Sequence, residues 1–137
     1  MSRSADLMAN DLFEAARKAM ALAHAPYSKF PVGAAIRAED GTIYAGANIE
    51  NLSFPEGWCA ETTAISHMIM GGARKILEVA VIAEKLPLCP PCGGCRQRLS
   101  EFAEAGTPIY LCDETGVKKT VVLSDLLPHS FATDTIG

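Results

Sequence analysis

The sequence predicts an α/β fold, a three-layer α/β/α sandwich around a mixed five-stranded sheet. Segments with helical spacing alternate along the chain with short apolar segments typical of strands. The last two strand-like segments, 109–112 and 117–123, are joined only by residues 113–116. So short a link favours an antiparallel pair, because a parallel pair needs a crossover of about a dozen residues.

The first third of the chain predicts a helix and a hairpin. Residues 5–24 place apolar side chains at helical spacing, so an amphipathic helix is expected to end before Pro26 and to cover one face of the sheet. Segments 32–36 and 42–47 flank Asp40-Gly41, which is a strong turn signal. We expect these two segments to form an antiparallel hairpin.

The next three elements are expected to be a helix, a strand and a helix. Residues 59–70 carry apolar side chains at helical spacing and stop at Gly71-Gly72, which predicts a buried helix. Residues 79–83 form a short apolar run suited to a central strand, and 92–103 indicate a third helix that ends before Gly106. Both of these helices therefore open on a cysteine.

Length and composition set the class of protein. The 137 residues, 49% of them hydrophobic and 20% charged, fit one domain spanning residues 1–137. Residues 1–10 hold no apolar run of signal-peptide length and no stretch approaches membrane-spanning length, so we expect a cytoplasmic protein. The net charge of −4 argues against a protein that wraps nucleic acid, and Lys118-Lys119 is too small a basic patch to change this.

Three of the five cysteines occur in a pattern typical of a metal site. Cys59-Ala60-Glu61 is followed by Pro91-Cys92-Gly93-Gly94-Cys95. Three soft ligands suit tetrahedral zinc and leave one position for water, which indicates a catalytic site, and helix starts stabilise thiolates. Glu61 would lie near the metal without binding it, where a proton carrier is required. The odd number of cysteines, three of them spaced for a metal and not for disulfides, agrees with a reducing compartment.

Other interpretations of these residues remain open. Cys89 and Cys92 form a second C-x-x-C, which could be a dithiol redox pair or could give zinc a fourth, structural ligand. Glu61 by itself could be a solvated helix residue. His67 falls on the helical face of Cys59, but eight residues at 1.5 Å rise separate the two by about 12 Å along the helix. It is therefore interpreted, like the other histidines, as a core or surface residue.

The order and spacing of four segments resemble the small homotetrameric zinc-dependent cytidine deaminases. The similarity extends from Ala25-Pro26-Tyr27-Ser28 through Leu126-Leu127-Pro128 to Phe131, nearly end to end. The four segments are Phe30-Pro31-Val32-Gly33-Ala34-Ala35, Asn48-Ile49-Glu50-Asn51, Cys59-Ala60-Glu61 and Pro91-Cys92-Gly93-Gly94-Cys95-Arg96-Gln97.

The resemblance implies hydrolysis of cytidine and 2′-deoxycytidine to uridine and 2′-deoxyuridine, with release of ammonia, in pyrimidine salvage. One zinc ion per subunit, held by Cys59, Cys92 and Cys95, would activate the water that attacks C4 of the pyrimidine. Glu61 would take the proton from this water, deliver it to ring N3 and later protonate the departing amine. Backbone groups near Ala60 would help to hold the reacting base.

The resemblance also implies roles in substrate binding. Asn48 and Glu50 would hold the ribose hydroxyls, and Phe30 would stack on the base. Phe131 would reach the site of a neighbouring subunit in a homotetramer. From the residues alone, Phe30 and Phe131 could equally be core residues, and Asn48 and Glu50 could stabilise a turn at a strand end.

The chain departs from this family at two places. Relatives usually carry Arg directly after the catalytic Glu, where its charge offsets the three thiolates, but Thr62 stands here and brings no charge. We therefore expect Arg96 or another nearby cation to compensate in part. Phe54 replaces a frequent Tyr, and residues 55–58 are unusual, which bears on substrate range.

Two alternative functions follow from the same residues. One is a deaminase of another aminopyrimidine nucleoside, such as blasticidin S, although the N-x-E-N segment favours the ordinary nucleoside. The other is a zinc-stabilised structural module in which Cys89 closes the metal's shell, which would leave Glu61 unexplained. An acidic chain without a glycine-rich phosphate loop disfavours nucleic-acid and nucleotide substrates.

Overall fold

The computed structural model describes residues 2–86 and 88–129, of which 2–8 are described as backbone. Its centre is a five-stranded sheet of order β2-β1-β3-β4-β5, in which β3 and β4 are parallel and the other neighbours are antiparallel. The predicted mixed sheet and the central position of its third strand are therefore confirmed. The strands are β1 (Val32–Ala38), β2 (Ile43–Ala47), β3 (Ile76–Ala83), β4 (Pro108–Asp113) and β5 (Gly116–Val122).

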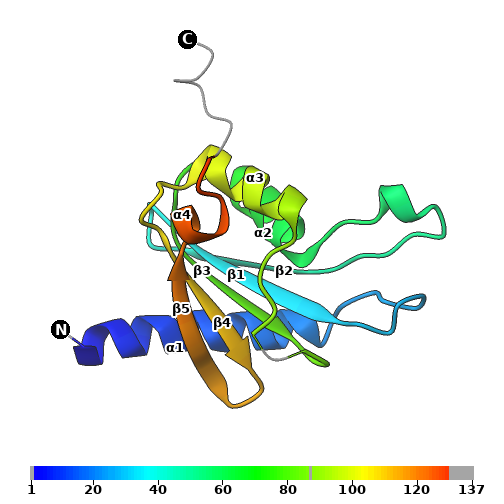
Figure 1. Ribbon diagram of the computed structural model, residues 1–137, viewed down its shortest axis with the longest axis horizontal. Coiled ribbons are helices and arrows are strands. Elements are labelled where there is room, and N and C mark those ends of the chain that lie inside the picture. Colours follow the sequence, from blue (N-terminus) through cyan, green and yellow to red (C-terminus); the bar gives the residue numbers. More distant parts are fainter. Residues whose placement is uncertain (1, 87, 130–137) are drawn as a thin grey trace, which may run out of the picture.

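Helices cover both faces of the sheet, as the three-layer prediction requires (Figure 1). Helix α1 (Ser2–Met20) lies along one face, and α2 (Ala60–Met70) and α3 (Gly93–Phe102) lie on the other. A single-turn helix α4 (Leu123–Leu126) follows β5, and a 3-10 turn η1 (Phe54–Glu56) lies in the long connection from β2 to α2. Because α3 provides the crossover between parallel β3 and β4, both cysteine-bearing helices lie on the same face.

Two apolar clusters hold the layers together. On the α1 side, Leu12 and Ala16 pack with Ala80 and Ile82 of the central strand. On the opposite side, Met68 of α2 and Leu99 of α3 are buried in the larger cluster. The alternation of side chains along β3 supplies both clusters, which explains why this strand reads as a continuous apolar run.

Two strand glycines let the helices approach the sheet closely. A Cβ at Gly33 would lie 2.0 Å from the carbonyl oxygen of Ala16, and a Cβ at Gly46 would lie 2.4 Å from the backbone nitrogen of Ala64. The first contact seats α1 on β1, and the second seats α2 on β2. Gly46 thereby fixes how close the start of α2, with its cysteine, lies to the hairpin.

Most element boundaries differ from the predicted ones by one to four residues; β3, for example, begins at Ile76 and not at residue 79. Helix α1 ends at Met20, and His24 instead pairs with the segment after β2: its N–H donates to Asn48 O at 3.0 Å, and its carbonyl accepts from Glu50 N at 2.8 Å. The last predicted strand ends at Val122, because Leu123 begins α4. In the part of the chain that the structure describes, no helix combines the length and hydrophobicity needed to cross a bilayer.

Candidate metal centre and active site

Three thiols meet where the first turns of α2 and α3 converge. Cys59 is the N-cap of α2, Cys92 is the N-cap of α3, and Cys95 lies in the first turn of α3. Their sulfur atoms lie within 4.8 Å of one another, and the Sγ atoms of Cys59 and Cys92 are 3.6 Å apart. Thiolates that share one tetrahedral zinc, each about 2.3 Å from the ion, lie about 3.8 Å from one another. The cluster therefore fits the ion in both donor type and spacing.

The local backbone explains why these thiols can be deprotonated. Unsatisfied N–H groups at two helix starts point toward the cluster and favour negative charge there. The hydrogen bond with Cys95 lowers the pKa of Cys59, whereas the same bond, followed by burial, raises the pKa of Cys95. The hydrogen bond between these two thiols therefore shifts their pKa values in opposite directions.

Neither Cys89 nor His67 belongs to this cluster. The metal-capable group found among the described residues contains only the three thiols named above. Cys89 lines the neighbouring cavity, its Sγ lies 3.8 Å from Pro90 O, and burial raises its pKa. His67 is exposed, with Nδ1 3.2 Å from Ala45 O. The geometry therefore favours an open three-thiolate site over a closed four-cysteine one.

Glu61 is one of the few buried charged side chains in the structure. It lies in the first turn of α2 and is only 4% exposed. Burial raises the pKa of its carboxyl group, because the charged form loses its hydration. A carboxylate with a raised pKa is a stronger base than an exposed one, as a group that accepts a proton requires.

A cavity of about 330 Å³ joins these groups to most of the predicted substrate-binding residues. Its lining combines the loop that enters β1, the segment that follows β2, the start of α2 and the segment before α3. The predicted site residues that line it are Phe30, Asn48, Glu50, Cys59, Ala60, Glu61 and Cys92. Phe131, the remaining predicted binding residue, lies outside the described residues, and Cys95 is fully buried behind the cavity wall.

Asn48 is held firmly at the edge of this cavity. Its Nδ2 donates to Phe30 O at 2.9 Å, and its Oδ1 accepts from Val32 N at 2.9 Å. A side-chain amide has two N–H donors and two lone pairs on oxygen, so one donor and one acceptor position remain for a ligand. The turn-stabilising interpretation of Asn48 and the binding interpretation are therefore compatible.

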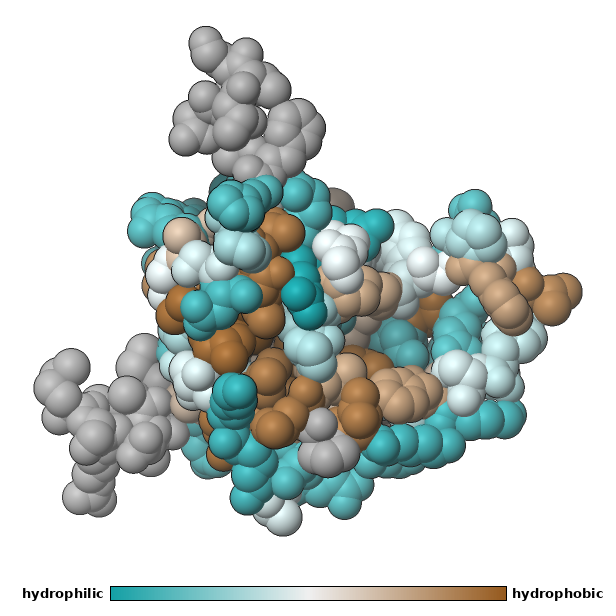
Figure 2. Space-filling model, viewed as in Figure 1, coloured by the Kyte–Doolittle hydropathy of each residue, from teal (hydrophilic) through white to brown (hydrophobic). Residues whose placement is uncertain are grey.

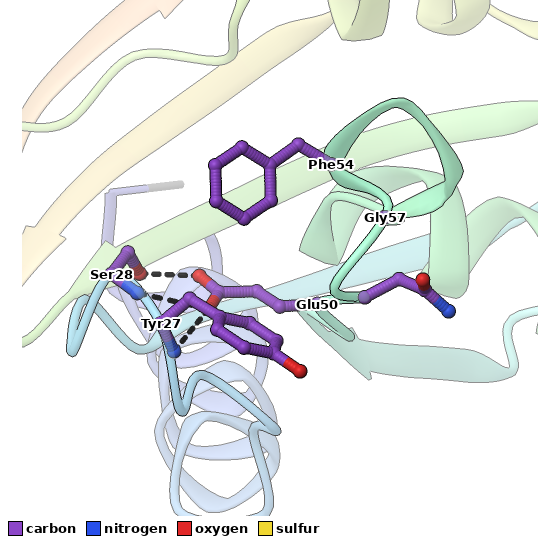
Figure 3. Close-up of a pocket in the computed structure, with 6 residues that line it drawn as sticks. Tyr27, Ser28, Glu50, Phe54 and Gly57 are labelled. Atoms are coloured by element: carbon purple, nitrogen blue, oxygen red, sulfur yellow. Dashed lines mark hydrogen bonds between the residues drawn. The ribbon is translucent and has the colours of Figure 1, made fainter.

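Ser28, which the sequence did not single out, positions Glu50. The Glu50 carboxylate accepts hydrogen bonds from the Ser28 hydroxyl and from the backbone N–H groups of Tyr27 and Ser28, the latter two at 3.0 Å (Figure 3). These bonds, the Ser28 hydroxyl first among them, hold the pKa of Glu50 below its ordinary value. Glu50 is thus kept as an oriented anion at the cavity. The signal in the sequence that could have indicated Ser28 is its place in the segment 25–28, where the family resemblance begins.

A second cavity of about 380 Å³ adjoins the first, because Ser28 and Glu50 line both. Tyr27 and Phe54 flank it with ring centroids 6.0 Å apart, and both side chains are exposed (Figure 3). Phe54 belongs to the η1 segment that projects from the body of the molecule (Figure 1). The unusual segment 54–58 therefore contributes to the outer part of the same depression.

The contacts of Cys95 show which groups could offset the negative charge of the three thiolates, given that Thr62 stands where relatives usually have Arg. The Thr62 hydroxyl lies 3.6 Å from Cys95 Sγ and can donate to the thiolate, but it is neutral. The Arg96 guanidinium donates to two backbone carbonyls: its Nε to Pro91 O at 2.8 Å and its Nη1 to Leu126 O at 2.9 Å. Arg96 therefore links the segment before α3 to α4.

Comparisons with known proteins agree with this geometry. Residues 8–111 match the family described as the cytidine and deoxycytidylate deaminase zinc-binding region. The chain is 42% identical to the cytidine deaminase of Sporosarcina psychrophila over 126 residues, covering 92% of this chain and 93% of that one. It is 41% identical to that of Halalkalibacterium halodurans, covering 82% and 85%. The crystal structure of the Burkholderia pseudomallei cytidine deaminase superposes with a TM-score of 0.83 at 37% identity, covering 88% and 97%.

Proposed function

The chain belongs to the cytidine and deoxycytidylate deaminase zinc-binding family, and on this premise we propose that it deaminates cytidine and 2′-deoxycytidine. Water and the nucleoside are converted to uridine, or 2′-deoxyuridine, and ammonia. The observation that carries this function is the cavity in which the thiol cluster and a buried carboxyl group face the same space. A purely structural zinc module has no use for such an arrangement.

The cofactor is zinc, and we assign its protein ligands as Cys59, Cys92 and Cys95. When bound, the ion acts as a Lewis acid that lowers the pKa of a coordinated water to near neutrality. Three protein ligands would leave room for a water molecule on a four-coordinate zinc ion, and Cys59 and Cys92 line the cavity through which it would enter. Cys95 is fully buried and would bind the ion from the protein interior.

Glu61 is proposed as the catalytic proton carrier. Its carboxylate accepts one proton of the attacking water and passes it to N3 of the pyrimidine. It then accepts the remaining proton of the hydroxyl group formed on C4 and delivers it to the amine, which leaves as ammonia while the C4 carbonyl forms. Burial raises the pKa of Glu61, which makes its carboxylate a stronger base toward the attacking water. Its place in the first turn of α2 keeps it beside the thiol cluster without adding a fourth ligand.

The substrate-binding roles rest on the same cavity. We assign Asn48 and Glu50 to the ribose hydroxyls, because both are preorganised by backbone contacts and retain hydrogen-bonding capacity toward the cavity. Phe30 would lie against the base, and the backbone of Ala60 would contact its reacting end. Phe131 remains a proposed contribution from a neighbouring subunit.

We further propose that residues 1–137 act as one catalytic domain within a homotetramer. Leu52, Phe54 and Trp58 are 77%, 72% and 50% exposed, and the tip of the projecting η1 segment is hydrophobic (Figure 2). Exposed apolar clusters of this kind mark association surfaces. The cytoplasm is the proposed compartment, since it keeps zinc-binding thiols reduced. Light scattering of the wild type and of Phe54→Glu measures the molar mass of each protein. We expect a tetramer for the wild type and a smaller species for Phe54→Glu. A monomeric wild type would contradict the proposed assembly.

Substrate identity is tested by the loss of absorbance of the aminopyrimidine on adding zinc-loaded protein. Cytidine, 2′-deoxycytidine, cytidine 5′-monophosphate and blasticidin S would be compared at equal concentration. The proposal predicts turnover of the first two and little turnover of the nucleotide, because the acidic chain offers no phosphate cradle. Turnover confined to blasticidin S would replace the proposed substrate with the alternative one.

A further inference from the structure

Charge balance at the thiol cluster poses a problem that neither Thr62 nor Arg96 solves. Three thiolates around a divalent ion carry a net negative charge, and Glu61 nearby adds to it when ionised. Cys95 is fully buried, so water cannot screen its sulfur effectively. Thr62 is neutral, and Arg96 directs its guanidinium to two backbone carbonyls.

Among the described residues, the cationic side chain that contacts the thiol cluster is that of Arg98. Its Nη1 lies 4.0 Å from Cys95 Sγ. Arg98 lies three residues after Cys95 on α3, so the two side chains share one helical face. An arginine remains charged at every working pH, and its N–H groups are suited to donating to a thiolate.

Gly94 creates the space in which this guanidinium lies. A Cβ at Gly94 would stand 3.2 Å from Arg98 Nη1, closer than most Cβ contacts, and at an ordinary contact distance of 3.8 Å from its Cζ, so the guanidinium would have to shift slightly. A Cβ at the preceding Gly93 would meet nothing within 4 Å. The two glycines between Cys92 and Cys95 are therefore not equivalent: only the second one makes room for the cation.

We propose that Arg98 is a positioning residue of the zinc centre, which stabilises the thiolate of Cys95 by a charge held in place by the space at Gly94. This proposal rests on the proposed zinc site. Arg98 acts from the solvent side of α3, while the Thr62 hydroxyl reaches the same sulfur from α2. Two helices thus share the task of stabilising one buried ligand.

The test is the rate at which zinc passes from the purified protein to the chromogenic chelator 4-(2-pyridylazo)resorcinol, measured in 0.05 M and 1 M NaCl. Because partners of metal ligands typically change metal affinity 10- to 100-fold and Arg98 is exposed, we expect Arg98→Gln to release zinc about tenfold faster at low salt. The difference should shrink at 1 M salt, where the Debye length is about 3 Å. Arg98→Lys should retain most of the wild-type behaviour.

Gly94→Ala and Gly93→Ala form a matched pair, because both add one methyl group to the first turn of α3. Gly94→Ala should speed zinc release in the direction of Arg98→Gln, and Gly93→Ala should not. The double variant Thr62→Arg with Arg98→Gln should restore slow release by supplying the charge from α2. Zinc release by Arg98→Gln at the wild-type rate, or equal and salt-independent losses in Arg98→Gln and Arg98→Lys, would overturn the role of Arg98 alone. Wild-type protein that binds no zinc would overturn the proposed site as well.

Discussion

Asn48 ties down the backbone of Phe30: its Nδ2 donates to the Phe30 carbonyl at 2.9 Å, while its Oδ1 accepts from the N–H of Val32. One side chain thus fixes the path of the segment that enters β1 and, with it, the wall of the cavity. One donor and one acceptor of the amide remain, and Asn48 lines the cavity. The proposed function therefore combines support of the fold and substrate binding in this residue.

Asn48→Ala should weaken substrate binding and stability together. Two hydrogen bonds to the backbone are lost and partly buried groups are left unpaired, so we expect a loss of about 1–3 kcal/mol in unfolding free energy. KM for cytidine should rise by about tenfold or more, with a smaller change in kcat. Denaturant unfolding and steady-state kinetics provide both values. Asn51→Ala is the control, because Asn51 accepts a hydrogen bond from the nearby Ser53 N, and equal effects of the two changes would contradict the role of Asn48.

Glu50→Gln should change how stability depends on pH. The hydrogen bond from Ser28 and its companions lower the pKa of Glu50 from 4.5, so the ionised form is favoured in the folded state. The stabilisation is therefore complete above about pH 6 and is lost as pH falls through the folded-state pKa, below 4.5. The stability difference between the wild type and Glu50→Gln should stay constant from pH 6 to 8 and narrow in acid. Ser28→Ala should reproduce part of this narrowing, and a difference independent of pH would refute the assignment.

Cys89→Ser should leave zinc content unchanged and remove the fast-reacting thiol of the zinc-loaded protein. Cys89 stands apart from the thiol cluster, and burial raises the pKa of Cys112 to about 11 and keeps it fully inaccessible. Titration with a disulfide reagent should therefore count one accessible thiol in the wild type and none in the variant, and chelation should free the thiols of Cys59 and Cys92, whereas Cys95 is as buried as Cys112. Loss of zinc from Cys89→Ser would instead support a four-cysteine site.

Gly46→Ala should destabilise the fold strongly. The added Cβ would lie 2.4 Å from Ala64 N and 2.8 Å from Ala60 O, both backbone atoms that cannot move without shifting α2. We expect a loss of about 1–3 kcal/mol or more. Gly106→Ala, whose Cβ would meet nothing within 4 Å, should stay within about 0.5 kcal/mol of the wild type. Similar unfolding midpoints for both variants would show that α2 does not pack on β2 as described.

The sequence predicted most elements because their signals are local. Asp40-Gly41 marked the hairpin, where Gly41 indeed has φ 81, and the two cysteines that open helices marked the metal site. The predicted helix over residues 5–24 extends too far, because the backbone of His24 pairs with that of Asn48 instead of continuing the helix. No local sequence pattern encodes this contact. The single turn of α4 is too short to produce a periodic signal.

The residues of the candidate site also fall into those that the sequence could identify and those that it could not. Chemistry-bearing residues such as Cys59 and Glu61 could be identified from type and spacing, and the resemblance extended this to Asn48 and Glu50. Ser28 and Arg98 could not, because each acts through a neighbour whose orientation depends on the folded backbone. Positioning residues of this kind carry no sequence signature of their own.

The central claim is that Glu61 moves protons beside a zinc ion held by three thiolates. Wild type and Glu61→Gln would be compared for cytidine turnover and zinc content, the amide being close in size to the buried carboxyl group. We predict equal zinc in both proteins, near one ion per chain, and a loss of activity of at least about 10²- to 10⁴-fold in the variant. Full zinc with undiminished turnover in Glu61→Gln would contradict the account.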